Sequence, residues 1–105
     1  MQLCCSDTPP TAIFLNDDAM APDAYAAFRR LGLKVGQDIA VVGFDDILLA
    51  SFNDPPLTTI CKSNIEQGRL AGQMLVDLIN GKQPVQRQIS IDTTLVVRAS
   101  CGANV

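Results

Sequence analysis

The strongest constraint on the fold comes from two short apolar runs that are separated by one segment with helical spacing. The runs cover residues 11–15 (TAIFL) and 39–43 (IAVVG). Continuous apolar runs of this length predict strands that are buried on both faces, as in a parallel sheet. From residue 19 to residue 31, apolar residues recur every three or four positions, which predicts a helix. The order strand, helix, strand predicts a parallel βαβ unit and therefore an α/β fold.

Individual residues set the expected ends of that helix. Asp18 is a candidate N-cap, and Pro22 is tolerated only in the first turn. Arg29 and Arg30 fall in the last turn, where cations suit the helix dipole. We expect Gly32 to end the helix in a left-handed conformation.

The second half of the chain carries one strong helix signal between weaker strand patterns. Ser63–Glu66 is a capping box (S-x-x-E), and it predicts the start of a long helix that ends at Gly81. Residues 57–60 are a short strand candidate before this helix, and residues 88–91 and 94–98 are two further candidates after it.

Composition and charge exclude several classes of protein. No apolar run reaches the roughly 18–20 residues of a membrane span, so we expect no membrane association. No secretory signal follows Met1, so we expect a cytoplasmic protein. The eight Lys and Arg residues are scattered and the net charge is −3, which disfavours a nucleic-acid-binding surface in this segment. With 48% hydrophobic and only 18% charged residues, the composition suggests a chain that buries more of its surface than a monomer of 105 residues easily can.

The inventory of reactive side chains argues against an enzyme. The chain has no histidine, which excludes the common zinc sites with His ligands and any Ser–His or Cys–His catalytic pair. Its four cysteines include one adjacent pair but no C-x-x-C motif, and we expect reduced thiols. We therefore expect neither a metal nor a cofactor.

Two acidic clusters follow the two best strands. They are Asn16-Asp17-Asp18 and Phe44-Asp45-Asp46. Ligands of open α/β sheets bind outside the carboxyl ends of the strands, so Asp17 and Asp45 are candidate ligand contacts. Such carboxylates fit general acid–base chemistry, Mg²⁺ binding or hydrogen bonding to a hydroxyl-rich ligand, and the spacing does not choose among these. For Asp18 and Asp46 we expect structural roles, as a helix cap and as an acceptor for loop amides.

Four ordered motifs carry a resemblance to a known family. Residues 11–21 (TAIFLNDDAMA), 31–46 (LGLKVGQDIAVVGFDD), 54–60 (DPPLTTI) and 94–100 (TLVVRAS) resemble segments of LacI/GalR-type bacterial transcriptional repressors. The resemblance implies a three-layer, parallel-sheet fold like that of periplasmic sugar-binding proteins, incomplete in this chain. It further implies a small-molecule effector, with a sugar as the expected class, and a homodimer or higher homo-oligomer. The operator DNA would be bound by a helix-turn-helix that these residues do not contain.

The resemblance also assigns candidate ligand-binding residues. Asp45 looks like the family's effector-hydroxyl-binding aspartate. Asp17 occupies the position of a common Asn, and its carboxylate can only accept hydrogen bonds where an amide also donates them. Lys62 and Asn64 match positions near the cleft between the lobes.

By the same resemblance, the dimer interface is expected to include Ala21 and Pro22 of the first helix and Phe52 and Asn53. Residues 1–105 would form a partial effector-binding domain. Its C-terminal lobe would comprise residues 11–60 and about 94–105. Residues 61–93 would supply crossover segments and one helix of the N-terminal lobe.

Two other functions compete with the regulator. A periplasmic sugar-binding component of a transporter would share the two-lobed fold. A small α/β hydrolase or phosphatase could use Asp17 and Asp45, but the chain has no histidine and no nucleophile motif.

Overall fold

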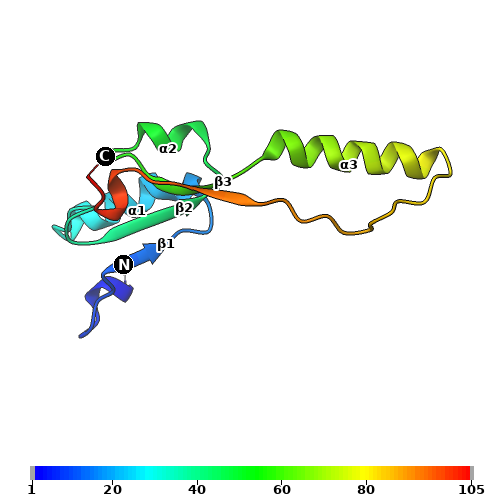
Figure 1. Cartoon of the computed structure of the whole chain (residues 1–105). Coiled ribbons are helices and arrows are strands. Elements are labelled where there is room, and N and C mark those ends of the chain that lie inside the picture. Colours follow the sequence, from blue (N-terminus) through cyan, green and yellow to red (C-terminus); the bar gives the residue numbers. More distant parts are fainter. Residues whose placement is uncertain (1, 105) are drawn as a thin grey trace. The chain divides into compact units, whose positions relative to one another are not determined.

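The chain forms two compact units in the computed structural model, which describes residues 2–104 (Figure 1). The first unit comprises Met1–Cys61 and Thr94–Val105, and the second comprises Lys62–Thr93. Each unit is described by itself below.

A four-stranded sheet organises the first unit. Its strands are β1 (Ala12–Phe14), β2 (Ala40–Phe44), β3 (Thr58–Lys62) and β4 (Thr93–Val96), and they lie in the order β1-β2-β3-β4. The pairs β1–β2 and β2–β3 are parallel. The predicted α/β class with a parallel sheet is therefore confirmed, and strands occur at four of the five predicted positions.

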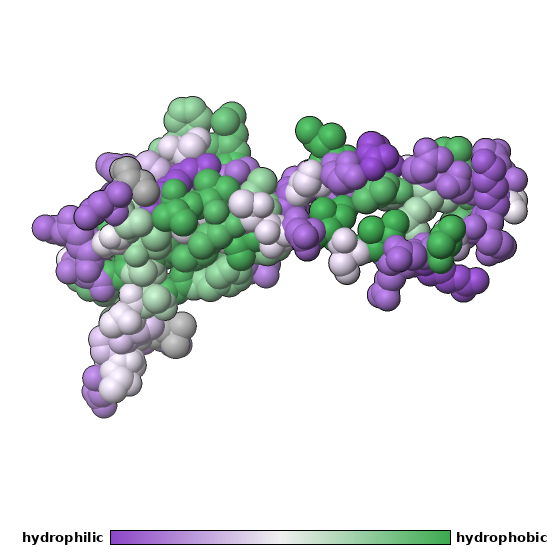
Figure 2. Space-filling view, viewed as in Figure 1, coloured by the Kyte–Doolittle hydropathy of each residue, from purple (hydrophilic) through white to green (hydrophobic). Residues whose placement is uncertain are grey.

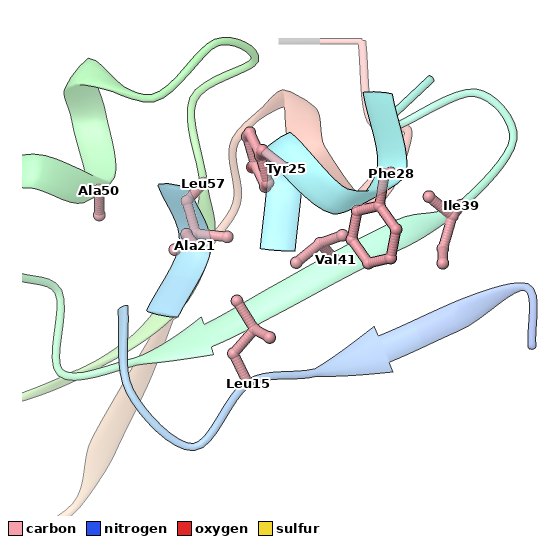
Figure 3. Packing of buried hydrophobic residues seen from close by; sticks show 8 residues of the cluster. All are labelled: Leu15, Ala21, Tyr25, Phe28, Ile39, Val41, Ala50 and Leu57. Atoms are coloured by element: carbon pink, nitrogen blue, oxygen red, sulfur yellow. The ribbon is translucent and has the colours of Figure 1, made fainter. Parts of the chain in front are cut away.

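Helix α1 (Ala21–Arg30) follows a short 3₁₀ helix, Asp18–Met20, and packs on one face of the sheet. Its buried residues join those of β2 and of the neighbouring segments in a single core (Figure 3). Phe28 points from α1 onto Val41 of β2 in this view. The core consists of Leu15, Ala21, Tyr25, Phe28, Ile39, Val41, Ala50 and Leu57.

The prediction that the first strand is buried on both faces is wrong. Ile13 of β1 packs against the core, whereas Phe14 beside it remains 59% exposed. Successive side chains of a strand point to opposite faces, and no element among residues 2–104 covers Phe14 enough to bury it.

The ends of α1 match only part of the prediction. Pro22 lies in the first turn, Arg29 and Arg30 lie in the last turn, and Gly32 adopts φ +73°. The N-cap is different, because the carboxylate that caps the preceding 3₁₀ helix belongs to Asp17 and not to Asp18. A further helix, α2 (Leu48–Phe52), forms where the sequence pattern indicated no regular element.

The second unit consists of α3 (Asn64–Ile79) and an extended return segment. The predicted capping box is confirmed on one side, since Ser63 Oγ accepts a hydrogen bond from the Glu66 backbone N–H at 3.4 Å. The strand predicted at residues 88–91 is wrong, because these residues pair with no neighbouring strand. No residue of α3 is buried, and Ile65 is 89% exposed.

Tyr25 gives the first unit a pH-sensitive reporter, because it is the only tyrosine of the chain. Its hydroxyl donates to the Pro55 carbonyl oxygen at 3.1 Å. Burial raises the pKa of the phenol above 10.0. A hydrogen bond with Ser100 offsets part of this rise, and the nearby charge of Asp54 adds to it. In the 105-residue chain, we expect phenolate absorbance to appear at higher pH in the folded state than in denaturant.

The same shift predicts a stability change at alkaline pH. Because the pKa of Tyr25 is higher in the folded chain than in the unfolded one, the phenol contributes to the free energy of unfolding. This contribution is complete below pH 10 and is lost as the pH rises through the folded pKa. Tyr25→Phe should remove this alkaline fall in the free energy of unfolding. Equal phenol titrations in the folded chain and in denaturant would contradict the prediction.

Candidate functional site

Polar side chains gather where β1, β2 and β3 approach their carboxyl ends. The backbone continues the parallel register beyond β1, since the Leu15 N–H donates to the Val42 carbonyl oxygen at 2.7 Å. Beyond β2, the Asp45 N–H donates to the Ile60 carbonyl oxygen at 2.9 Å. The two acidic clusters thus follow adjacent strands at one edge of the sheet, as expected for a ligand-binding edge.

The Asp18 carboxylate is the most deeply buried charged group at this edge. Its side chain is 0% exposed. Oδ1 accepts a hydrogen bond from Thr59 Oγ1 at 2.6 Å, and Oδ2 accepts one from the Ile47 backbone N–H at 3.1 Å. Asp18 therefore joins the segment after β1 to β3 and to the start of α2. The sequence predicted a structural role for Asp18, but as a helix cap.

Gly43 leaves the space that the Asp18 carboxylate occupies. A Cβ atom at this position would overlap Asp18 Oδ1 and would approach Leu57 Cδ2 to 2.8 Å. The glycine of the GFDD motif is therefore required by a close approach between β2 and a buried carboxylate.

Asp17 is half-buried and caps the short 3₁₀ helix, because its Oδ1 accepts from the Ala19 backbone N–H at 2.7 Å. This bond fixes the direction of the carboxylate and uses one of its acceptor oxygens. Its ligand-binding role stays a prediction.

Asp45 and Asp46 both have positive φ angles, of 107° and 52° respectively. The side-chain atom Oδ1 of Asp45 is buried. The Asp46 carboxylate binds a side chain that the sequence did not predict, since Oδ1 accepts from Arg98 Nη2 at 2.8 Å in an ion pair. Its role as an acceptor for loop amides stays a prediction. Both side chains of this pair are 21% exposed, so water screens their attraction only in part.

Arg98 and Ser100 are structural residues of this edge that sequence reasoning did not identify. Arg98 Nη1 donates to the Leu57 carbonyl oxygen at 2.9 Å. Ser100 Oγ donates to the Val41 carbonyl oxygen at 2.6 Å and accepts from the Thr58 N–H at 2.8 Å. The motif at residues 94–100 was the only signal, and it carried no information about these partners.

The remaining predicted ligand residues belong to the second unit. Lys62 ends β3 and is half-buried, and Asn64 is the first residue of α3 and is exposed. Both stay predicted ligand-binding residues.

The predicted dimer-interface residues have contrasting environments. Phe52 is 73% exposed and Pro22 is also exposed, whereas Ala21 is fully buried in the core. Asn53 is half-buried, and its Nδ2 donates to the Leu49 carbonyl oxygen at 3.1 Å. Figure 2 shows hydrophobic residues gathered on the surface of α2, where Leu48 is exposed together with Phe52.

Two further properties bear on the chemistry of the described part of the chain. Across residues 2–104, no three His, Cys, Asp or Glu side chains are grouped so that they could hold a metal ion. None of the helices in this range has the length and apolar character needed to cross a membrane.

Comparisons with known proteins identify relatives of almost the whole chain. Residues 2–101 match the family described as periplasmic binding protein-like domain. The HTH-type transcriptional repressor CytR of Escherichia coli K12 is 41% identical over 102 residues, which are 97% of this chain and 30% of CytR. The chain therefore spans less than a third of that relative.

Solved structures of transcriptional regulators are also similar to this chain. A complex of the transcriptional regulator CelR with cellobiose superposes with a TM-score of 0.80 at 34% identity, over 86% of this chain and 28% of that one. The lac repressor dimer bound to operator and the anti-inducer ONPF superposes with a TM-score of 0.81 at 38% identity, over 90% and 28% respectively.

The contact between Gly43 and Asp18 predicts the effect of one added methyl group. In the 105-residue chain, Gly43→Ala should lower the free energy of unfolding by about 1–3 kcal/mol, because the methyl group must displace the carboxylate or Leu57. Urea denaturation measures this change.

Gly68→Ala is the matched control, because a Cβ there meets nothing within 4 Å. In the interior of α3 the same substitution should stabilise the helix by roughly 0.5–1 kcal/mol. A Gly43→Ala variant as stable as the parent chain would refute the steric account of Gly43.

Proposed function

Because the chain belongs to the periplasmic binding protein-like domain family, in the form found in LacI-type transcriptional regulators, we propose that it is part of a regulator's effector-binding region. In this proposal the effector controls the binding of operator DNA by a helix-turn-helix outside residues 1–105. The name of CytR supports a DNA-binding repressor, and the lac repressor was solved on its operator.

The division of the chain into two units supports the proposed placement in a two-lobed domain. Residues 11–60 and about 94–105 form part of the C-terminal lobe. Residues 61–93 contribute crossover segments and one helix to the N-terminal lobe. The boundaries of the two units, at residues 61/62 and 93/94, fall close to these limits.

The observation that carries the effector proposal is the position of Asp45. It directly follows β2, its backbone bonds to β3, and its carboxylate includes a buried oxygen. An ionised carboxylate accepts hydrogen bonds from hydroxyl groups, which suits a sugar. Cellobiose in the CelR complex supports this chemical class. Asp17, Lys62 and Asn64 complete the proposed contacts.

Control of a distant DNA-binding segment needs no chemistry at this site. The effector must only bind two arrangements of the lobes with different affinities, and the difference in free energy then shifts the population between them. We therefore propose a protein without catalytic activity that acts in the cytoplasm, where operator DNA is found. A transporter component is not favoured, because the relatives are transcriptional regulators.

The proposed regulator is a homodimer or a higher homo-oligomer. The exposed Phe52 and Pro22 support an interface on α2 and at the start of α1. Asn53 extends this surface, and the buried Ala21 supports it from the core. The lac repressor structure contains a dimer, in agreement with this proposal.

The effector proposal is tested in the complete protein that contains these residues. Thermal melting is followed with ribose, glucose, galactose, lactose, cellobiose and adenosine, because a ligand of the native state raises the melting temperature. We expect one of these compounds to do so. Asp45→Asn should weaken its binding roughly 10- to 100-fold, since a hydrogen bond to a charged acceptor is lost.

Asp7→Asn makes the same chemical change at an exposed position before β1 and should leave the melting shifts unchanged. Shifts of equal size in the parent protein and in Asp45→Asn would show that Asp45 does not bind the effector. If none of the six compounds raises the melting temperature, the result would argue against a sugar or nucleoside effector.

The oligomer proposal predicts an effect of charge on α2. Phe52→Asp should weaken self-association of the complete protein by about 2 kcal/mol or more, as expected for a buried aromatic interface residue. Sedimentation velocity over a concentration series measures the dissociation constant. Gln37→Asp adds a charge at another exposed position and serves as the control. An unchanged dimer in Phe52→Asp would place the interface elsewhere.

A further inference from the structure

Two consecutive residues after β2 hold a backbone conformation that side chains disfavour. Asp45 has φ 107° and Asp46 has φ 52°. Asp46 lies in the left-handed helical region, where aspartate is tolerated, but the φ of Asp45 lies beyond it. Residues keep such angles only when the surrounding structure imposes them, and they cluster at ligand-binding sites.

Contacts with β3 and with Arg98 hold this pair of residues in place. The Asp45 N–H donates to the Ile60 carbonyl oxygen at 2.9 Å. The Asp46 N–H donates to Thr59 Oγ1 at 3.4 Å, which is a long bond. The Asp46 carboxylate accepts from Arg98 Nη2 at 2.8 Å, and this charge-assisted contact is the stronger of the two at Asp46.

The guanidinium of Arg98 is itself fixed in direction. Its Nη1 donates to the Leu57 carbonyl oxygen at 2.9 Å, while Nη2 holds Asp46. The planar guanidinium therefore links the residue before β3 to the turn after β2. Thr58 holds the Arg98 backbone independently of the guanidinium contacts. The Arg98 N–H donates to Thr58 Oγ1 at 2.8 Å, and Thr58 Oγ1 donates to the Arg98 carbonyl oxygen at 2.9 Å.

We propose that Arg98 is a positioning residue of the effector site, which holds Asp46 and thereby sets the backbone from which the Asp45 carboxylate projects. The inference rests on the proposed role of Asp45. Arg98 lies 52 residues after Asp46, so the proposed site depends on a residue that is distant in the sequence.

Two substitutions at one position separate backbone geometry from the ion pair. Asp46→Ala and Asp46→Gly both remove the carboxylate that Arg98 holds. Alanine disfavours positive φ, whereas glycine adopts it without steric cost. If Arg98 acts by holding the backbone, Asp46→Gly should keep the parent geometry at Asp45 and Asp46→Ala should lose it.

The geometry is measured in the 105-residue chain by NMR, through the one-bond Cα–Hα coupling of Asp45, which distinguishes positive from negative φ. We expect the parent value in Asp46→Gly and a shift to the negative-φ value in Asp46→Ala. Arg98→Met should shift the coupling as Asp46→Ala does, and the double variant Arg98→Met/Asp46→Gly should restore it.

A merely structural role of Arg98 predicts a different pattern. Asp46→Ala and Asp46→Gly would then behave alike, and glycine would not rescue Arg98→Met. Either result overturns the proposal, as does a parent coupling in Asp46→Ala. The two single Asp46 variants keep Arg98 and its bonds to Leu57 and Thr58, so the test stands even if Arg98→Met does not fold.

Binding in the complete protein separates this proposal from the function on which it rests. With the six compounds used above, Asp46→Ala should lose about tenfold in affinity and Asp46→Gly should keep the parent affinity. Equal affinities in both variants would contradict the positioning role. If none of the six compounds binds the parent protein while the couplings are as expected, the sugar-effector proposal is refuted. The proposal that Arg98 positions the backbone at Asp45 and Asp46 then remains intact.

Discussion

The edge of the sheet that carries the candidate site depends on the contacts of the buried Asp18 carboxylate. A charge removed from water is costly unless hydrogen bonds replace its hydration. Thr59 and the Ile47 N–H supply these bonds, and Gly43 leaves the space for them. One side chain thus locks the segment after β1 to β2, to β3 and to the start of α2. These are the segments that present the candidate ligand contacts.

Each acidic pair contains one residue that holds distant segments together and one that stays a candidate ligand contact. In the first pair, Asp18 is fully buried, while Asp17 is half-buried and caps a short helix. In the second pair, Asp46 binds Arg98 and Asp45 remains the candidate effector contact. Asp18 and Asp46 thus hold the backbone that carries the candidate ligand contacts, and a binding site needs such support.

Much of the fold was predictable, because periodicity and local capping depend on neighbours in sequence. The βαβ order, Gly32 and the Ser63 cap are examples. The predictions failed where a partner distant in sequence decides the outcome. Residues 88–91 have a strand pattern but no strand to pair with. The caps of the first helix were misassigned, because only the fold reveals that Asp18 faces Thr59, 41 residues away.

The α/β class, the family resemblance and the position of two acidic clusters after two strands could be predicted from the sequence. All of these follow from the order and spacing of residues along the chain. Tertiary structure alone decided which carboxylate of each pair is structural, and it alone brought Arg98 to Asp46. The physical reason is that the pairing and burial of a charge depend on which distant donors fold around it, and spacing along the chain carries no record of those donors.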